Sequence, residues 1–295
     1  MFVTGKGGVG KSALAAALAA ESARAGRRTL LVVQEQADLR HPQLGVVAAY
    51  RPAQIEPNFD LCRIDGRSAL KEYVHRTMTL PGLYDWFLNS TAFKHFTEAA
   101  PGFEELMCLG KIYDLVSDSK YDLVVFDGPA TGHAALMLRV PRTTGAAVRT
   151  GPLHHNALKI QLMLENDVTT RIVIVSLAEE MAIREATELA GYVTGELAMH
   201  LGPMIVNRVT RQLFDRTEVD ALRAATSASP ALTRMVHAAS ARFERATAES
   251  QYIAALRSER PWLIQVPQIV LARHDPALLI DGIVANLSTG VSHHG

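Results

Sequence analysis

The run Gly-Lys-Gly-Gly-Val-Gly-Lys-Ser, from Gly5 to Ser12, has residue types that can surround a phosphate group. It fits the phosphate-binding loop pattern G-x-x-x-x-G-K-[ST] at every fixed position. The glycines leave the backbone bare, so successive N–H groups can turn toward phosphate oxygens. Lys11 would place its ammonium on the β- and γ-phosphates, and Ser12 would give its hydroxyl to Mg²⁺. The run therefore predicts a site for a nucleoside triphosphate.

The segments on either side of this run fit the same interpretation. A short β-type stretch, 2–4, precedes it, and the alanine-rich segment 13–25 is typical of a helix. The positive N-terminal end of such a helix would add to the anion site. The alternative is a secretory signal with Ala-x-Ala triplets. Its apolar region would be weak, and its removal would leave a chain that begins within the fold.

Asp127 is the second residue with a chemical role in this pattern. It ends an apolar run, 121–126, that predicts a buried strand. A carboxylate at the carboxyl end of such a strand, beside a phosphate loop, can anchor Mg²⁺. Gly128 and Gly132 would let the following loop change shape when the γ-phosphate is present. The alternative is a strand-to-helix turn that Asp127 merely caps.

Strand and helix patterns alternate along the chain, which favours a parallel sheet with crossover helices. Further strands are expected at 29–33, 61–64, 171–175, 202–206 and 262–266. Helices are expected at about 179–200, from Ser229-Pro230 onward, and at about 277–287 after Pro276. We therefore predict one α/β domain over 1–295. It would be a doubly wound, mostly parallel sheet of the P-loop NTPase type, with an inserted helical subdomain at approximately 67–118 and 142–167.

The composition sets limits on partners and compartment. The chain has 295 residues, is 48% hydrophobic and carries a formal net charge of zero. No global field favours nucleic acid, and no apolar run approaches the ~20 residues that span a bilayer. Cys62 and Cys108 are far apart and form no C-x-x-C, so we expect buried thiols in a reducing cytoplasm.

Lys6 makes the loop more specific, because an ordinary phosphate loop needs no lysine at that position. This deviant loop resembles that of the ATPase class that contains the arsenite-pump ATPase, the tail-anchored-protein targeting ATPases, the septum-placing and plasmid-partition ATPases and the nitrogenase iron protein. The resemblance implies that Lys6 reaches the nucleotide of a facing subunit. The alternative is a solvated surface lysine.

The run from Asp127 to Pro141 resembles the switch II signature of the ArsA and guided-entry ATPase family, which escorts tail-anchored membrane proteins. Val206-Asn207-Arg208 resembles that family's V-N-Q, whose Asn contacts adenine, and Val266-Pro267-Gln268 resembles its loop over the adenine ring. The resemblance implies a dimeric ATPase with ATP and Mg²⁺ as cofactors and hydrophobic membrane proteins as clients. The implied nucleotide contacts are Gly5, Lys6, Gly7, Gly8, Val9, Gly10, Lys11, Ser12, Ala13, Asn207, Pro267 and Gln268, with Ser12 and Asp127 at the metal.

The chain departs from the family in switch I, where the last Asp of T-D-P-A-H-x-L-x-D positions the attacking water. Pro42 stands at that place, and proline cannot orient water. Asp38 would substitute if the loop is offset, and Glu35 matches the first Asp. The expected catalytic residues are therefore Lys6, Lys11 and Asp38. The alternative function is a weakly hydrolysing, nucleotide-gated subunit that regulates a related ATPase partner. The zinc C-x-x-C and the arsenite cysteines are absent, as in bacterial paired members.

Two further features leave alternatives open. The apolar residues of the helical stretch suit either a client groove or the packing of the subdomain on the sheet. They are Phe87, Phe93, Phe96, Met107, Met163 and Leu164. His154-His155 lacks a third ligand at zinc spacing, so a solvated or capping pair is expected. A partition or positioning ATPase is a third functional option, and the neutral charge counts against it.

Overall fold

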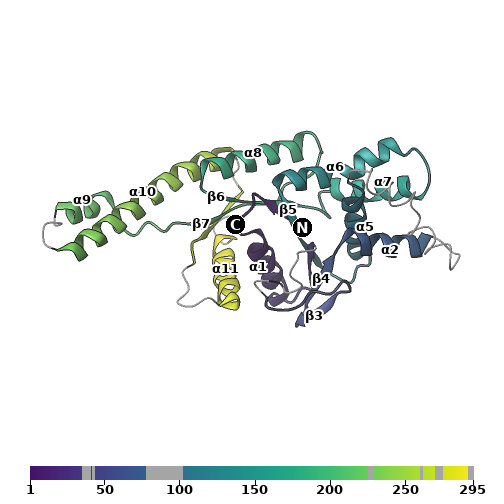
Figure 1. The fold of residues 1–295 in the computed structure, drawn as a ribbon, viewed down its shortest axis with the longest axis horizontal. Coiled ribbons are helices and arrows are strands. Elements are labelled where there is room, and N and C mark those ends of the chain that lie inside the picture. Colours follow the sequence, from purple (N-terminus) through teal and green to yellow (C-terminus); the bar gives the residue numbers. More distant parts are fainter. Residues whose placement is uncertain are drawn as a thin grey trace.

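A computed structural model gives the structure of the chain, and it describes residues 1–34, 41, 44–77, 102–224, 229–259, 262–269 and 275–291. A sheet lies at its centre, with helices on both faces (Figure 1). Within the described residues the sheet has eight strands in the order β3-β4-β2-β5-β1-β6-β7-β8. They are β1 (Phe2–Gly5), β2 (Thr29–Gln34), β3 (Ala53–Glu56), β4 (Phe59–Ile64), β5 (Leu123–Ala130), β6 (Ile172–Leu177), β7 (Met204–Val209) and β8 (Leu263–Pro267).

The strand order places the phosphate-type loop near the middle of the sheet. Strand β1 pairs with β5 on one side and β6 on the other, and both pairings are parallel. The carboxyl ends of β1, β5 and β6 therefore lie at one edge, where ligands bind in open parallel sheets. Only β3 runs antiparallel, paired with β4 at the rim. Asp127, in the second half of β5, is thereby brought next to the segment that follows β1.

Successive side chains of the central strands enter two different cores. In β2, Leu30 and Val32 belong to one core and Leu31 and Val33 to the other. The first core contains residues of α2 (Gly66–Thr77), α5 (Phe103–Ser117), α6 (Thr131–Ala147), α7 (Pro152–Glu165) and α8 (Glu180–Gly195). The second contains residues of α1 (Lys11–Arg24) and α11 (Pro276–Val291). Burial on both faces explains the continuous apolar runs and confirms the doubly wound α/β fold.

Helix α1 packs closely on the sheet because most of its buried residues are alanines. Ala15, Ala16 and Ala17 are fully buried, and alanine loses little entropy in a helix. The helix ends before Gly26, which has a φ of 85° and donates its N–H to the Ala23 carbonyl at 2.9 Å. A glycine in this left-handed conformation is a common helix stop.

The strand that carries Asp127 differs from the prediction. It begins at Leu123 and continues through Asp127 to Ala130, and α6 starts at Thr131. Gly128 is therefore a strand residue and Gly132 a helix residue, so the loop expected after Asp127 is absent. A Cβ on Gly128 would lie 2.8 Å from the Val3 carbonyl oxygen, so a glycine is needed for β5 to lie this close to β1. Strand β3 and helix α6 were not predicted at all.

Helices α2, α5 and α7, which fall within the expected helical subdomain, lie together. Helices α2, α5 and α7 line a cavity of about 290 Å³, whose lining includes Glu72, Lys111 and Lys159. Of the apolar residues considered for a client groove, Met107 and Leu164 are buried in the core, and Met107 also lines this cavity. Met163 is partly buried against the same core, and Phe87, Phe93 and Phe96 lie outside the described residues.

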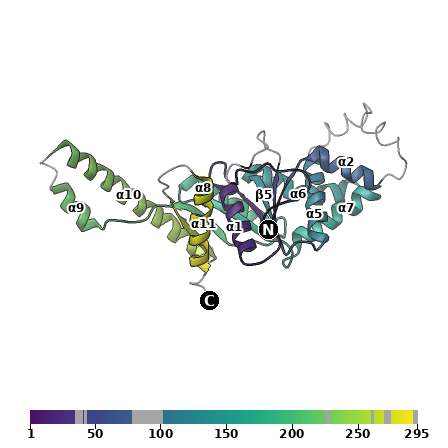
Figure 2. The ribbon, with the colours of Figure 1, turned by 90° about the horizontal axis from the view of Figure 1, so that it is seen from below.

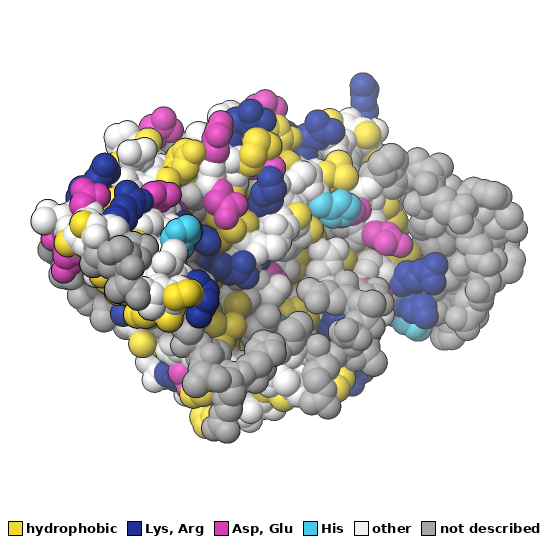
Figure 3. All heavy atoms as spheres, turned by 60° about the vertical axis from the view of Figure 1, so that its left-hand side comes forward, with side chains coloured by type: hydrophobic (Ala, Val, Ile, Leu, Met, Phe, Trp, Pro, Cys, Tyr) yellow, Lys and Arg dark blue, Asp and Glu magenta, His cyan; other side chains and the backbone are white. Residues whose placement is uncertain are grey.

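A helical arm projects from the β7–β8 side of the sheet (Figures 1 and 2). It consists of α9 (Arg216–Ala224) and the long helix α10 (Pro230–Glu259). Helix α10 starts as predicted, because the Ser229 hydroxyl accepts the N–H of Leu232 at 3.2 Å. Basic and acidic side chains are interspersed on the face seen in Figure 3. This mixture fits the zero net charge.

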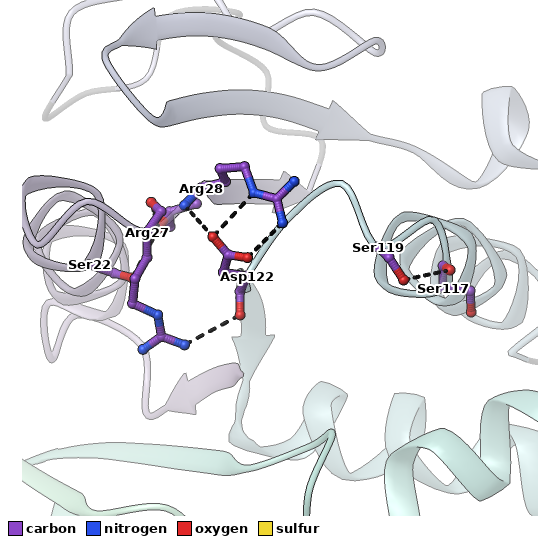
Figure 4. A network of polar contacts seen from close by, with 7 residues as sticks. Ser22, Arg27, Arg28, Ser117, Ser119 and Asp122 are labelled. Carbon is purple, nitrogen blue, oxygen red and sulfur yellow. Dashed lines mark hydrogen bonds and ion pairs between the residues drawn. The ribbon is translucent and has the colours of Figure 1, made fainter.

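An ion pair joins the two segments that lead into β2 and β5, at the amino ends of these strands (Figure 4). Arg28, just before β2, places Nη2 2.7 Å from Oδ1 of Asp122, just before β5. The Arg28 backbone N–H also donates to Oδ2 at 2.8 Å. These hydrogen bonds lower the pKa of Asp122 to about 2, and the bond from the Arg28 side chain is the larger cause. The pair fixes where two neighbouring strands begin, on the far side from the phosphate-type loop.

Two expectations from composition can be compared with the structure. Cys62 and Cys108 are both buried free thiols, and burial raises the pKa of Cys62 to about 12. Among the described residues, no helix is both long enough and apolar enough to cross a bilayer.

Candidate functional site

The loop between β1 and α1 is shaped by three glycines with positive φ. Gly5, Gly8 and Gly10 have φ values of 154°, 82° and 94°, which side chains of L-residues rarely adopt. A Cβ on Gly5 would overlap the carbonyl oxygen of Val175 in β6. Gly10 directly precedes the first residue of α1, so the free N–H groups of that helix face the loop. This backbone is suited to an anion.

Asp127 lies beside the two loop residues expected to handle phosphate and metal. Its side chain is buried. Burial raises the pKa of Asp127, while Ser12 and the charge of Lys11 oppose that rise. Conversely, burial lowers the pKa of Lys11, and the carboxylate of Asp127 opposes that fall. The structure thus brings Lys11, Ser12 and Asp127 together as predicted.

Lys6 forms an ion pair within its own chain. Its Nζ lies 2.6 Å from Oε1 of Glu185, on helix α8, and both side chains are about one-third exposed. The other oxygen of Glu185, Oε2, accepts the hydroxyl of Thr131 at 3.3 Å. The hydrogen bond from Lys6 is the main cause that lowers the pKa of Glu185. Glu185 therefore connects the loop after β1 to the first residue of α6.

The residues expected on the adenine side lie at the carboxyl ends of β7 and β8. Asn207 is buried, and its Nδ2 donates to the carbonyl of Val9 in the loop at 2.8 Å. Pro267 is paired with Val209, whose carbonyl accepts the N–H of Gln268 at 2.8 Å. Asn207 thus contacts the loop directly, while Pro267 and Gln268 sit one strand further away. Ala13, the last of the implied contacts, is buried in α1.

The switch I region is only partly visible. Glu35, Asp38 and Pro42 lie outside the described residues, so the role predicted for Asp38 has no structural counterpart here. His41 is described and is 5% exposed, with Nδ1 accepting the N–H of Leu44 at 3.3 Å. Its Nε2 is buried with no hydrogen-bond partner among the described residues. Burial lowers the pKa of His41 to about 4.

Sequence reasoning missed Glu185 as a partner of Lys6. The signal was topological, because Glu185 follows β6 in sequence and β6 is the neighbour of β1. Strand order cannot be read from the spacing of residues, so a carboxylate at position 185 could not be assigned to position 6. Thr131 was missed for the same reason, because it reaches the loop only through Glu185.

The donor set around Asp127 suits Mg²⁺. Oδ1 of Asp127 is buried without a hydrogen-bond partner among the described residues, and such an oxygen needs a donor or a cation. Mg²⁺ commonly takes one or two protein oxygens and completes its shell with water and phosphate. The described residues hold no cluster of three or more His, Cys, Asp or Glu that could bind a metal by itself. Ser12 and Asp127 therefore fit an ion bound together with a nucleotide.

A mostly parallel sheet, with a phosphate-type loop after its first strand and a buried carboxylate beside it, defines an α/β fold of the P-loop NTPase type. Residues 1–156 match the family model described as anion-transporting ATPase. The chain belongs to this family, which confirms the family resemblance of its motifs.

Several curated proteins are similar to this chain. ATPase BagA of Mycobacterium tuberculosis is 31% identical over 223 residues, which cover 70% of this chain and 64% of that protein. ATPase ASNA1 homolog 1 of Paramecium tetraurelia is 28% identical over 141 residues, 48% of this chain and 43% of that protein. ATPase GET3 of Malassezia globosa is 29% identical over 143 residues, 48% and 42% of the two chains. The matches thus span less than two thirds of these relatives.

Proposed function

We propose that this chain binds Mg·ATP at the loop Gly5–Ser12 and hydrolyses it as an ATPase of its family. The observation that carries the proposal is the buried Oδ1 of Asp127, which has no hydrogen-bond partner among the described residues. An ionised oxygen without a partner is costly to bury. Its place beside a loop lysine and hydroxyl is accounted for by a cation that arrives with the nucleotide. The names of the relatives, all ATPases, support the same reaction.

Each residue of the site would have a defined task. Lys11 would bind the β- and γ-phosphates, and the loop N–H groups would hold the β-phosphate. Ser12 and Asp127 would hold Mg²⁺, which neutralises charge on the phosphates when bound. Asp38 would orient the attacking water in place of the family's switch I Asp, and Lys11 and Lys6 would stabilise the charge that develops in the transition state.

The proposal includes a dimer, either of two copies or with a related ATPase subunit, in which Lys6 reaches the partner's nucleotide. In the structure Glu185 holds Lys6 at 2.6 Å, so closure would exchange this carboxylate for a phosphate. The link from Glu185 to Thr131 would report the exchange to α6. The family resemblance supports hydrophobic membrane-protein clients and a place in the cytoplasm.

Calorimetric titration with ATP, with and without Mg²⁺, tests the binding step, and phosphate release tests turnover. We expect Mg²⁺-dependent binding that Lys11→Ala weakens by at least tenfold, because a charge-assisted contact is lost. Lys159→Ala, which removes an exposed lysine of α7, is the control and should bind as the unmodified chain does. Equal affinity for ATP in Lys11→Ala would reject the site.

The second candidate is a nucleotide-gated subunit that binds ATP and hydrolyses it poorly. Pro42 at the switch I position favours it, because no side chain there can orient water. The two candidates differ in turnover at equal ATP affinity. Turnover that is lost in both Lys6→Ala and Asp38→Ala supports the autonomous ATPase. Tight Mg·ATP binding without turnover, restored by a second ATPase subunit, supports the regulatory candidate.

A further inference from the structure

Arg208 has a backbone conformation that is unusual for a bulky residue. Its φ is 56°, in the left-handed region, where side chains other than glycine and asparagine are strained. It lies in a β-bulge, because Val206 pairs with Gln265 and Val209 with Pro267, which leaves Asn207 and Arg208 opposite a single residue. Bulges beside active sites commonly redirect a side chain. Strained backbone of this kind is often found at binding sites, so Arg208 is a candidate functional residue.

Hydrogen bonds from both ends of the Asn207 amide hold the bulge against the phosphate-type loop. Nδ2 donates to the Val9 carbonyl at 2.8 Å, and Oδ1 accepts the N–H of Arg208 at 2.9 Å. An ideal Cβ built on Gly10 would lie 2.5 Å from Asn207 Nδ2 and 4.0 Å from Nη2 of Arg208. The guanidinium is therefore placed beside the last residue of the loop.

This guanidinium carries a charge that the described part of the chain leaves uncompensated. Arg208 is exposed, and no ion pair or hydrogen bond joins its side-chain nitrogens to any other described residue. A planar guanidinium with five N–H donors suits phosphate oxygens better than any other side chain does.

We propose that Arg208 is a nucleotide-binding residue that donates from its own subunit to the phosphate chain of the bound nucleoside triphosphate. The proposal rests on the function proposed above and adds a third cation to Lys6 and Lys11. The bulge and the Asn207 bridge set the position of the guanidinium, so it would need little reordering when the nucleotide binds. Arg208 would thus add affinity in the absence of a partner subunit.

Replacement by asparagine tests the proposal, because asparagine tolerates positive φ and removes only the guanidinium. We expect Arg208→Asn to raise the Kd for Mg·ATP by about tenfold in calorimetry, with an unchanged or higher Tm. Arg208→Lys, which keeps the charge, should recover part of the loss. Arg211→Asn removes the same charge from the loop after β7, outside the bulge, and is the matched control.

The outcomes separate this inference from the proposed function. If the unmodified chain binds Mg·ATP, Lys11→Ala does not, and Arg208→Asn binds like the unmodified chain, Arg208 is not a nucleotide-binding residue. If Arg208→Lys loses as much as Arg208→Asn and both lose equally for ATP and adenosine, the guanidinium contacts the base, and the phosphate assignment is wrong. If the unmodified chain does not bind Mg·ATP, the proposed function itself fails.

Discussion

The buried carboxylate of Asp127 has a cost for folding, and its proposed role is to hold Mg²⁺. The carboxylate is buried, and burial is the main reason that its pKa is raised. A raised pKa means that the folded protein disfavours the charged form, so this charge destabilises the free protein at neutral pH. Residues kept for function at the expense of stability are common in binding sites.

We therefore predict that Asp127→Asn raises the stability of the nucleotide-free chain while it abolishes Mg²⁺-dependent ATP binding. The Tm should rise by ~1–3 °C, because the neutral amide avoids the burial of a charge. Asp122→Asn is the matched control with the opposite sign, because Arg28 lowers the pKa of Asp122 and so favours its ionised form. Differential scanning calorimetry of the two variants measures both effects, and a lower Tm for Asp127→Asn would contradict the prediction.

His41 predicts a specific pH dependence of stability. Its pKa is lowered by burial from 6.5 to about 4, so the unfolded chain binds a proton at a higher pH than the folded chain. The contribution of neutral His41 to the free energy of unfolding is fully present above pH ~6.5. It is lost as the pH falls toward 4, by up to ~1.4 kcal/mol per pH unit. His41→Asn keeps an acceptor for the N–H of Leu44 and removes the titration.

Chemical denaturation between pH 4 and 7 measures the effect of His41. The slope of the unfolding free energy against pH should be smaller in His41→Asn than in the unmodified chain over this range. His155→Asn is a control, because His155 is an exposed histidine of α7. An identical slope in the chain and in His41→Asn would show that His41 is not the group that titrates.

At the same scale, the sequence predicted the residues whose roles follow from local spacing. Lys11 and Ser12 belong to one contiguous pattern, and Asp127 directly follows the apolar run 121–126 that predicts its strand. Glu185 and Arg208 could not be predicted, because the first depends on β6 lying next to β1 and the second on a bulge in β7. Neither feature leaves a mark in the residues themselves.

Helix α8 carries Glu185, which holds the side chain of Lys6 within its own chain, and this contact leads to a prediction about the helix. Glu185→Gln should make Lys6 react several-fold faster with an acylating reagent, because the amine loses its carboxylate partner at 2.6 Å. Mass spectrometry of the peptide that contains Lys6 gives the rate. Glu188→Gln changes an exposed carboxylate on the same helix, which pairs with Arg184 at 3.5 Å, and should leave the rate unchanged.

The elements were predicted to different depths. The central strands were found because burial on both faces leaves continuous apolar runs, as at 29–33. Helix α6 was missed because Gly132 and Pro141 are typical breakers, although Pro141 is buried within the helix and tolerated there. Strand β5 continues past Asp127 because its pairing with β1 extends to Ala130, a tertiary contact that local sequence does not encode.

At the scale of the whole molecule, Glu249 joins the helical arm to the sheet by hydrogen bonds. It is buried on α10, accepts the N–H and hydroxyl of Thr210 at 2.6 and 3.0 Å, and pairs with Arg245 at 2.7 Å. Thr210 follows directly after β7. The arm is thus joined to the sheet two residues beyond Arg208.

We predict that Glu249→Ala lowers the free energy of unfolding by ~1–3 kcal/mol, because it leaves the buried N–H of Thr210 without an acceptor. Amide hydrogen exchange should speed up in α10 more than in α1. Glu244→Ala removes an exposed carboxylate of the same helix, paired with Arg223, and should change stability by less than ~0.5 kcal/mol. Unchanged denaturation of Glu249→Ala would show that the arm is held by its apolar contacts alone.

Because α10 is bonded to the sheet at Glu249, a small rotation of the helix about that residue would move its far end much further. From Glu249 to the start of α10 at Pro230 the helix extends for roughly 30 Å, at about 1.5 Å per residue. A tilt of ~5° about Glu249 would therefore move the Pro230 end of the helix by ~2.6 Å, close to the length of a hydrogen bond. Glu249 bonds Thr210, which directly follows the strand with the bulge that holds Arg208. A small tilt at this edge of the sheet would therefore become a larger displacement at the far end of the arm.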